Sequence, residues 1–313
     1  MCLLNREKFL CGIGSPVMRL QRAELPILIL GGTGRLGTIV RRFQSPDIKV
    51  LWQARRAEPG IDLVWSPEDG LASLQSQLAR INVTRLRAVV ALWGVVPGKA
   101  ADLGLNTQLA HVAADLALAL QADRVLHCSS AAVYKPGPAP ARESDVPAPV
   151  SAYGRAKFAM ESAVLHRHRH APQSPQPCIL RIGNVIGADA LSIAMRVAAH
   201  RGTPVTLDRF ANGQGPARSF ISGSDLSLCL AALVRCDLSA LPETVNLAAH
   251  QPTSMADLVQ EAGMPLAWRP ALAGAVPLVA LDTTLLRGII DLGPDSGTAG
   301  HLLGNRTKAM MPQ

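Results

Sequence analysis

A run of glycines directly after a short apolar segment restricts the fold of this chain more than any other feature. The apolar segment covers residues 27–30, and the run reads Gly31-Gly32-Thr33-Gly34-Arg35-Leu36-Gly37. In this spacing the first glycine allows a tight turn, the second lets a ligand approach the backbone, and the third lets a helix pack closely on a strand. The sequence therefore predicts a buried strand, a sharp turn and a helix whose N-terminus binds a phosphate group.

The order of strand and helix then repeats along the chain. Further short apolar segments alternate with helical ones: we predict strands at 48–52, 62–65, 87–93, 124–128 and 178–182, and helices at 71–81, 106–120 and 153–166. Continuously apolar strands separated by helices are typical of a parallel sheet that is covered on both faces. We therefore predict an α/β fold, a doubly wound parallel sheet of Rossmann type, which binds ligands beyond the carboxyl ends of its strands.

The alternation becomes irregular after Gly187, which predicts a smaller C-terminal substrate lobe. We expect helices at 191–200, 224–234 and 254–261, a loop at 204–215 and a strand at 245–247, followed by a tail broken by proline and glycine. The predicted dinucleotide-binding domain covers 24–187 with roughly 217–248, and the predicted substrate lobe covers roughly 188–216 and 249–303. We expect residues 1–23 to be a mobile N-terminal extension and 304–313 to be a frayed tail.

Composition and charge exclude several classes of protein. The chain has 313 residues, of which 48% are hydrophobic and 17% are charged, as expected for a soluble globular protein. Its net charge is +8, but residues 1–23 contribute +3 and the pair Arg306 and Lys308 adds +2, so only +3 remains on the body. No stripe of Lys and Arg interleaved with aromatic residues appears, so we predict a small-molecule partner and no nucleic acid.

The N-terminal segment and the cysteines indicate a cytoplasmic protein. The first 23 residues have no sustained apolar core, so we expect neither a secretory signal nor a membrane span. The six cysteines show no paired metal-ligand spacing and no compact disulfide framework. His166, His168 and His170 alternate with arginines, which would repel a cation, so we predict no metal site.

The end of the second predicted strand indicates which dinucleotide is bound. An acidic residue there would bond the adenosine ribose and repel a phosphate on it, but none lies between Val50 and Ala57. Arg55 and Arg56 lie there instead, and Arg35 lies in the glycine run. We therefore predict a preference for NADP(H), with NAD(H) as the alternative if these arginines are simply solvated.

Tyr153 and Lys157 form a candidate proton-transfer pair. They lie one helical turn apart, so their side chains share a face of the helix. A free phenol has a pKa of about 10, and a nearby cation lowers it by roughly 1 to 3 units, toward the range useful for proton transfer. Ser129 and Ser130 end a predicted strand and either line the same crevice or serve only to form a turn, and Ser130 is the better candidate for bonding a substrate oxygen.

From about residue 25 to residue 262 the sequence resembles the extended short-chain dehydrogenase/reductase family. The resemblance rests on motifs in family order: the glycine run, Asn106, Ser129-Ser130-Ala131-Ala132-Val133-Tyr134, Tyr153-x-x-x-Lys157, Arg181-Ile182-Gly183-Asn184-Val185-Ile186-Gly187, Arg218-Ser219-Phe220-Ile221 and Val245-Asn246-Leu247. This family includes nucleotide-sugar epimerases, dehydratases and reductases that depend on NAD(P).

The resemblance implies a role for each matching residue. Tyr153 is expected to be the acid/base, Lys157 to lower its pKa and bond the nicotinamide ribose, Ser130 to polarise the reacting C–O group, and Asn106 to support the site. Asn184 and Arg218 are expected to contact the substrate diphosphate, and the helices at 106–120 and 152–165 to allow a homodimer. The predicted cofactor-binding residues are Gly31, Thr33, Gly34, Arg35, Leu36, Gly37, Arg55, Arg56 and Ser129.

Some positions depart from the family pattern. Trp93 replaces a small residue where the cofactor runs close to the backbone, and Trp65-Ser66 replaces the family's usual Asp-Leu, which removes an expected contact with adenine. The prediction is an NAD(P)-dependent oxidoreductase or epimerase-type enzyme that transfers hydride at a hydroxyl or carbonyl carbon of a nucleotide sugar, with carbonyl reduction favoured. The alternatives are a reductase of small hydrophobic carbonyl compounds and a non-catalytic NADP(H)-sensing protein.

Overall fold

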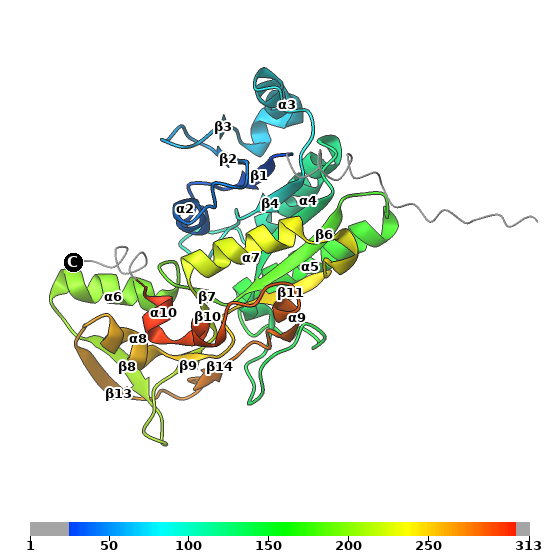
Figure 1. Ribbon diagram of the computed structural model, residues 1–313. Coiled ribbons are helices and arrows are strands. Elements are labelled where there is room, and N and C mark those ends of the chain that lie inside the picture. The colour runs from blue at the N-terminus through cyan, green and yellow to red at the C-terminus, as the bar shows by residue number, and fades with distance from the viewer. Residues whose placement is uncertain (1–24, 305–313) are drawn as a thin grey trace, which may run out of the picture.

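A seven-stranded parallel sheet forms the centre of the protein, as the computed structural model of residues 25–304 shows (Figure 1). The predicted extension at 1–23 and residues 305–313 of the predicted tail lie outside the described residues. In spatial order the strands are β11 (Thr244–Leu247), β6 (Gln176–Ile182), β5 (Arg124–Ser130), β4 (Ala88–Ala91), β1 (Ile27–Leu30), β2 (Val50–Ala54) and β3 (Leu63–Val64), and every neighbouring pair is parallel.

Helices cover both faces of this sheet, which confirms the predicted doubly wound α/β fold. On one face α2 (Arg35–Arg42) and α7 (Gly223–Arg235) pack on the strands, and on the other lie α3 (Gly70–Arg80), α4 (Leu105–Ala119) and α5 (Ala152–His170). The strand order reverses direction from β1, with β2 on one side and β4 on the other, so both βα turns open into one crevice.

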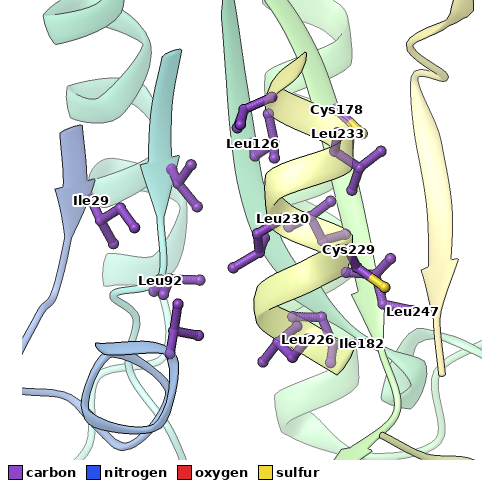
Figure 2. Packing of buried hydrophobic residues seen from close by; sticks show 14 of the residues in the cluster. Ile29, Leu92, Leu126, Cys178, Ile182, Leu226, Cys229, Leu230, Leu233 and Leu247 are labelled. Carbon is purple, nitrogen blue, oxygen red and sulfur yellow. The ribbon is translucent and has the colours of Figure 1, made fainter. Parts of the chain in front are cut away.

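The core forms because the strands are apolar on both sides. All four residues of β1 and of β4 are buried, as expected for central strands covered by helices. Figure 2 shows Leu226, Leu230 and Leu233 of α7 pointing onto the sheet, where they meet residues such as Leu126 of β5 and Ile182 of β6. Each fully buried leucine stabilises the fold by about 1.5–3 kcal/mol.

Side chains also fix the ends of helices that matter for the site. The hydroxyl of Ser151 accepts a hydrogen bond from the Gly154 N–H at 3.0 Å, which sets the start of α5. At the C-terminus of α7, Arg124 donates to the carbonyl of Leu233 at 2.7 Å and Arg87 donates to that of Val234 at 2.7 Å. These two arginines tie the C-terminus of α7 to the amino-terminal ends of β4 and β5.

The smaller C-terminal lobe lies beside the sheet and has its own core (Figure 1). It contains α6 (Ala190–Arg201), α8 (Met255–Glu261) and α10 (Ala299–Leu302), and its apolar centre includes Leu191, Phe220 and Val259. Short strands connect it to the rest: β7 (Asn184–Val185), β9 (Ala217–Arg218), β10 (Phe220–Ile221), β12 (Thr253–Ser254) and β14 (Leu278–Val279). The helix α9 (Thr284–Arg287) packs against β11.

One prediction about this lobe was wrong. Residues 204–215 were expected to be a loop, but β8 (Val205–Arg209) runs through the segment and pairs in parallel with β13 (Leu266–Pro270). Val205 and Leu207 are buried while Thr206 is exposed, which is the alternation of a half-buried strand. The flanking proline and glycines hide so short an alternation in the sequence.

No helix within residues 25–304 is both long enough and apolar enough to cross a membrane.

Candidate active site

A cavity of about 590 Å³ opens beyond the carboxyl ends of β1, β2, β4 and β5. That volume falls within the range of small-molecule and cofactor sites. Among the residues predicted from the sequence, those that line it are Gly31, Thr33, Gly34, Arg35, Leu36, Arg55, Tyr153 and Lys157. The glycine turn and the proton-transfer pair therefore face one another across a single space, although over a hundred residues separate them along the chain.

The glycine turn needs its glycines for steric reasons. Gly31 has a φ of +89°, a conformation that side chains rarely adopt, and a Cβ there would lie 2.9 Å from the backbone nitrogen of Trp93. A Cβ on Gly37 would collide with the carbonyl oxygen of Gly31. Gly34 precedes α2 and offers no capping side chain, so the first N–H groups of the helix stay free to bind an anion.

Gln53 supports this turn and was missed in the sequence. Its side chain is buried on β2, where Oε1 accepts a hydrogen bond from the Gly31 N–H at 3.0 Å and Nε2 donates to the carbonyl of Trp65. The signal was present, because Gln53 is the one polar residue within the segment Val50–Ala54. A polar group at a buried position has to find partners, and here those partners are the turn and Trp65, the residue that follows β3.

Arg35 and Arg55 line the cavity together with Glu68, which follows β3. Arg56 is exposed and is not part of the lining. The pKa of Glu68 is lowered, first by its hydrogen bond with Ser66 and to a lesser extent by the charge of Arg55. Two cations and one anion thus surround this end of the cavity.

Trp93 leaves room for a ligand because its ring turns toward Trp65. The two rings stack with centroids 6.3 Å apart and planes 28° apart. Trp93 still contributes to the cavity wall. The departure from the family pattern at this position is therefore accommodated by a second departure, Trp65, which is fully buried under α3.

Tyr153 and Lys157 lie on the same wall of the cavity, on the first two turns of α5. The Lys157 ammonium is 5.9 Å from the centre of the Tyr153 ring and donates a hydrogen bond to the carbonyl of Cys128 at 2.8 Å. Burial lowers the pKa of Lys157, although the nearby Cys128 and Glu161 act in the opposite direction.

The pKa of Tyr153 differs from the sequence-based expectation. A cation was expected to lower it, but burial raises it well above the value of a free phenol, and Cys128 adds to that increase. A hydrogen bond with Ser130 acts in the lowering direction and is the smaller effect. Tyr153 therefore holds its proton at neutral pH.

Asn106 holds the wall segment that follows β4. It is buried in the first turn of α4, where Oδ1 accepts from the Val95 N–H at 3.1 Å and Nδ2 donates to the carbonyls of Val95 and Leu103, each at 3.0 Å. Gly94 lies between Asn106 and Lys157, since a Cβ there would be 2.9 Å from Asn106 Oδ1 and 3.2 Å from Lys157 Nζ. Asn106 is thus separated from the lysine only by the backbone of Gly94.

The two serines at the end of β5 point to different places. Ser130 accepts a hydrogen bond from the Ala132 N–H at 3.2 Å and is the hydroxyl partner of Tyr153. Ser129 is buried and donates its hydroxyl to Glu161, so its side chain does not reach the cavity. The structure therefore places the Ser129 hydroxyl away from the space in which a cofactor contact was predicted.

Asn184 and Arg218 lie on β7 and β9, the short strands that connect the C-terminal lobe to the rest of the protein, and not in the cavity lining. The Asn184 N–H donates to the carbonyl of Ser219 at 2.9 Å. The Arg218 guanidinium donates to three carbonyls, those of Ala217 at 2.7 Å, Val276 at 2.8 Å and Pro277 at 3.1 Å. Arg218 is thus already engaged by main-chain oxygens.

The His166 and His170 rings stack on each other, with centroids 4.1 Å apart, at the end of α5. Among the residues from 25 to 304, no group of three His, Cys, Asp or Glu side chains is placed to hold a metal ion.

Comparison with known proteins agrees with this geometry. The sequence model of the NAD dependent epimerase/dehydratase family matches residues 27–248. The dTDP-6-deoxy-L-talose 4-dehydrogenase (NAD(P)(+)) of Kitasatospora kifunensis is 28% identical over 300 residues, which cover 87% of this chain and 92% of that protein.

Solved structures share the fold at low sequence identity. UDP-N-acetylglucosamine 4-epimerase from Bacillus cereus superposes with a TM-score of 0.72 at 19% identity, covering 92% of this chain and 100% of that one. UDP-glucose 4-epimerase from Thermus thermophilus, solved in complex with NAD, gives a TM-score of 0.68 at 18% identity and covers 90% of this chain and 100% of that one. At such identities the likeness establishes the architecture.

Proposed function

This chain belongs to the NAD dependent epimerase/dehydratase family, and we propose that it transfers hydride at a hydroxyl or carbonyl carbon of a nucleotide-linked sugar. It is an NAD(P)-dependent enzyme of the extended short-chain dehydrogenase/reductase type. The observation that carries the proposal is the single cavity shared by the glycine turn, Tyr153 and Lys157.

The residues divide the chemistry between them. A nicotinamide cofactor, when bound, would donate or accept the hydride. Tyr153 exchanges a proton with the substrate oxygen, and Ser130, its hydrogen-bond partner, orients that oxygen. Because burial raises its pKa, the phenol keeps its proton at neutral pH and can donate that proton to the oxygen of a carbonyl substrate as the carbonyl is reduced.

Lys157 and the glycine turn hold the cofactor. The ammonium has donor capacity beyond the Cys128 carbonyl, because a lysine carries three N–H groups. The free N–H groups at the start of α2 suit a pyrophosphate. The predicted division into a dinucleotide-binding domain and a substrate lobe is part of this proposal, and the separate core of the C-terminal lobe supports it.

The preference for NADP(H) rests on the charges around the adenosine end. Arg35 and Arg55 both line the cavity, and β2 carries no acidic residue that would repel a 2′-phosphate. Glu68 faces the same end and weakens the preference without cancelling two arginines. Titration of the purified protein with NADPH and with NADH should therefore give the lower Kd for NADPH.

The substrate class rests on the relative from Kitasatospora, whose name states a dTDP-linked 6-deoxy sugar. The test is to supply NAD(P)H or NAD(P)+ with a panel of dTDP- and UDP-linked hexoses and their 4-keto derivatives, and to follow nicotinamide absorbance. Turnover that requires the nucleotide moiety supports the proposal. Cofactor binding without turnover of any member would overturn it and favour a sensor.

The engagement of Arg218 favours a second candidate, a reductase of small hydrophobic carbonyl compounds. A guanidinium that already bonds three carbonyls is less available to a diphosphate. Turnover of simple ketones with no effect of Arg218→Ala on KM would identify this activity. An increase in KM that is confined to nucleotide-linked substrates would support the sugar nucleotide.

We also propose a cytoplasmic location and a homodimer. Cys128, Cys178, Cys229 and Cys236 are free thiols, as a reducing compartment would leave them. The helices α4 and α5 pack side by side, and Leu118 on α4 is 50% exposed, which suits a helical seam between two copies. Light scattering of the wild-type protein and of Leu118→Glu tests the dimer.

A further inference from the structure

A buried polar network lies behind the wall of the cavity, at the end of β5. Glu161 of α5 accepts hydrogen bonds from the hydroxyl of Ser129 and from the guanidinium of Arg181, whose Nη2 is 2.8 Å from Oε2. Ser129, Glu161 and Arg181 are only 2%, 1% and 5% exposed. The second Arg181 nitrogen, Nη1, donates to the Tyr134 hydroxyl at 2.8 Å, and Tyr134 in turn donates to Asn246 of β11 at 2.9 Å.

The network occupies a particular register between strand and helix. Ser129 of β5 and Arg181 of β6 are direct neighbours across the parallel sheet, so their side chains emerge side by side and meet the same carboxylate. Glu161 lies one helical turn beyond Lys157 on α5 and thus on the same face of the helix. The contact therefore fixes the position of α5 along β5.

Three consecutive residues of β5 contact three successive turns of α5. The Cys128 carbonyl accepts from Lys157, the Ser129 hydroxyl donates to Glu161, and Ser130 bonds Tyr153. Lys157 and Tyr153 line the cavity, whereas the contact between Ser129 and Glu161 is buried. A slip of α5 by a fraction of a turn would break all three contacts together.

A buried ion pair of this kind contributes more to the relative positions of the helix and strands that carry it than to the stability of the fold. Taking two charges out of water is costly, and a buried ion pair adds little net stability compared with apolar residues of similar volume. Burial alone would lower the pKa of Arg181, but its bonds to Glu161 and Tyr134 more than offset that, so the guanidinium stays charged. A buried charge pair is directional, and its best-attested use is to specify one arrangement of the elements that carry it.

We propose that Glu161, held by Arg181 and bonded to Ser129, is a positioning residue that sets the position of α5 along β5 and thereby places Tyr153 opposite Ser130. This inference rests on the proposed function only in giving Tyr153 its proton-transfer role. It assigns Ser129 to the support of the wall and not to cofactor contact. The charge of Glu161 is needed because Ser129 and Arg181 both donate to it.

The test uses the fact that the chain has only two tyrosines. Protein labelled with 3-fluorotyrosine should give two ¹⁹F NMR signals, and Tyr153→Phe identifies the Tyr153 signal by its loss. We expect Ser129→Ala and Glu161→Gln to shift or broaden the Tyr153 signal in the absence of any substrate. This readout does not depend on turnover, so it remains decisive if the proposed substrate class is wrong.

The matched control is Ser227→Ala. Ser227 is another buried serine that loses one hydrogen bond on substitution, here to the Phe43 carbonyl at 3.0 Å, and it lies between α7 and α2 on the opposite face of the sheet. We expect it to leave the Tyr153 signal in place even where it lowers Tm as much as Ser129→Ala does. A Tyr153 signal that is unchanged in Ser129→Ala and Glu161→Gln would overturn the proposal.

Kinetics with an active substrate extends the test. Ser129→Ala should lower kcat by about 10- to 100-fold with KM for the cofactor within about twofold, since small displacements of a reacting group have costs of this order. Ser129→Thr retains the hydroxyl and should restore most of kcat. Equal losses of kcat in Ser129→Ala and Ser227→Ala would show that the network is merely structural, which overturns the proposal.

Discussion

The ammonium of Lys157 donates a hydrogen bond to the main-chain carbonyl of Cys128, 2.8 Å away, so the end of β5 fixes the cation that faces the cavity. Because the acceptor belongs to the backbone, no single substitution at position 128 removes it. Lys157 is 2% exposed, and its ammonium lies 5.9 Å from the centre of the Tyr153 ring.

Replacing Lys157 by Met should abolish this arrangement while keeping the length of the side chain. We expect kcat to fall by about 100-fold or more, the usual range for loss of a proton-transfer component, and the Kd of the cofactor to rise. Kinetics and fluorescence titration measure the two effects. Lys99→Met removes an exposed lysine and should change neither; equal effects of the two substitutions would contradict a special role for Lys157.

Gly37→Ala should damage the glycine turn. The added Cβ would collide with the carbonyl of Gly31, and that contact is between backbone atoms that cannot move independently. We expect cofactor affinity to fall by at least about tenfold and Tm to drop, because α2 must move away from β1. Gly98→Ala is the control, since its Cβ would meet nothing within 4 Å, and calorimetry of both variants decides the matter.

Arg55 and Arg56 offer a matched pair for cofactor preference. Arg55 lines the cavity and Arg56 does not, although they are adjacent and both exposed. Arg55→Ser should raise the Kd of NADPH by about 10- to 100-fold, which corresponds to about 1.5–3 kcal/mol for a hydrogen bond to a charged group, and leave that of NADH little changed. Arg56→Ser should leave both constants unchanged. If both substitutions raise the Kd of NADPH equally, the two arginines act only through long-range electrostatic attraction and not through a direct contact of Arg55.

The sequence was sufficient for the fold because the signals that define it are local and repeated. The buried strands β1, β4 and β6 are largely apolar runs, and the glycine turn has a steric reason for its first and last glycines. These features depend on residues that are near one another in the chain. They can therefore be recognised without knowing the tertiary contacts.

Other parts of the site depend on contacts between distant residues and could not be predicted. The direction of the Ser129 hydroxyl follows from its hydrogen bond to Glu161, 32 positions away. The hydrogen bonds of the Arg218 guanidinium go in part to carbonyls 58 and 59 positions away. The pKa of Tyr153 was expected to follow the charge of Lys157, but the burial of the phenol decides it. Desolvation is a property of the folded cavity and not of any spacing in the sequence.

Alkaline conditions should destabilise the protein through its tyrosines. Burial raises the pKa of Tyr134 to about 12, despite its bonds to Arg181 and Asn246, whereas an unfolded tyrosine has a pKa of 10.0. Below pH 10 both states keep the proton; between pH 10 and 12 only the unfolded state loses it, so the free energy of unfolding falls as pH rises. Urea unfolding at several pH values in this window gives the free energy of unfolding, which should fall less steeply with pH in Tyr134→Phe than in the wild-type protein. An equally steep fall in both proteins would contradict the raised pKa of Tyr134.

His127 should make the protein sensitive to acid. It is 1% exposed on β5, neither ring nitrogen has a hydrogen-bond partner within the described structure, and its pKa is lowered from 6.5 to about 3. Burial is the main cause, and the positive charge of Lys157 adds to it. As pH falls below 6.5 the unfolded state gains a proton that the folded state does not, so stability is lost between pH 6.5 and 3, by several kcal/mol in order of magnitude.

The substitution His127→Leu removes the titrating group and keeps an apolar side chain against α4 and α5. We expect this variant to unfold at about the same urea concentration at pH 6.5 and at about pH 5, whereas the midpoint for the wild-type protein should fall. His200→Leu is the control, because it also removes an imidazole, from an exposed position on α6. A wild-type midpoint that does not change over this interval would mean that His127 is hydrated, since a water molecule bonded to its ring nitrogens would reduce the desolvation that lowers the pKa.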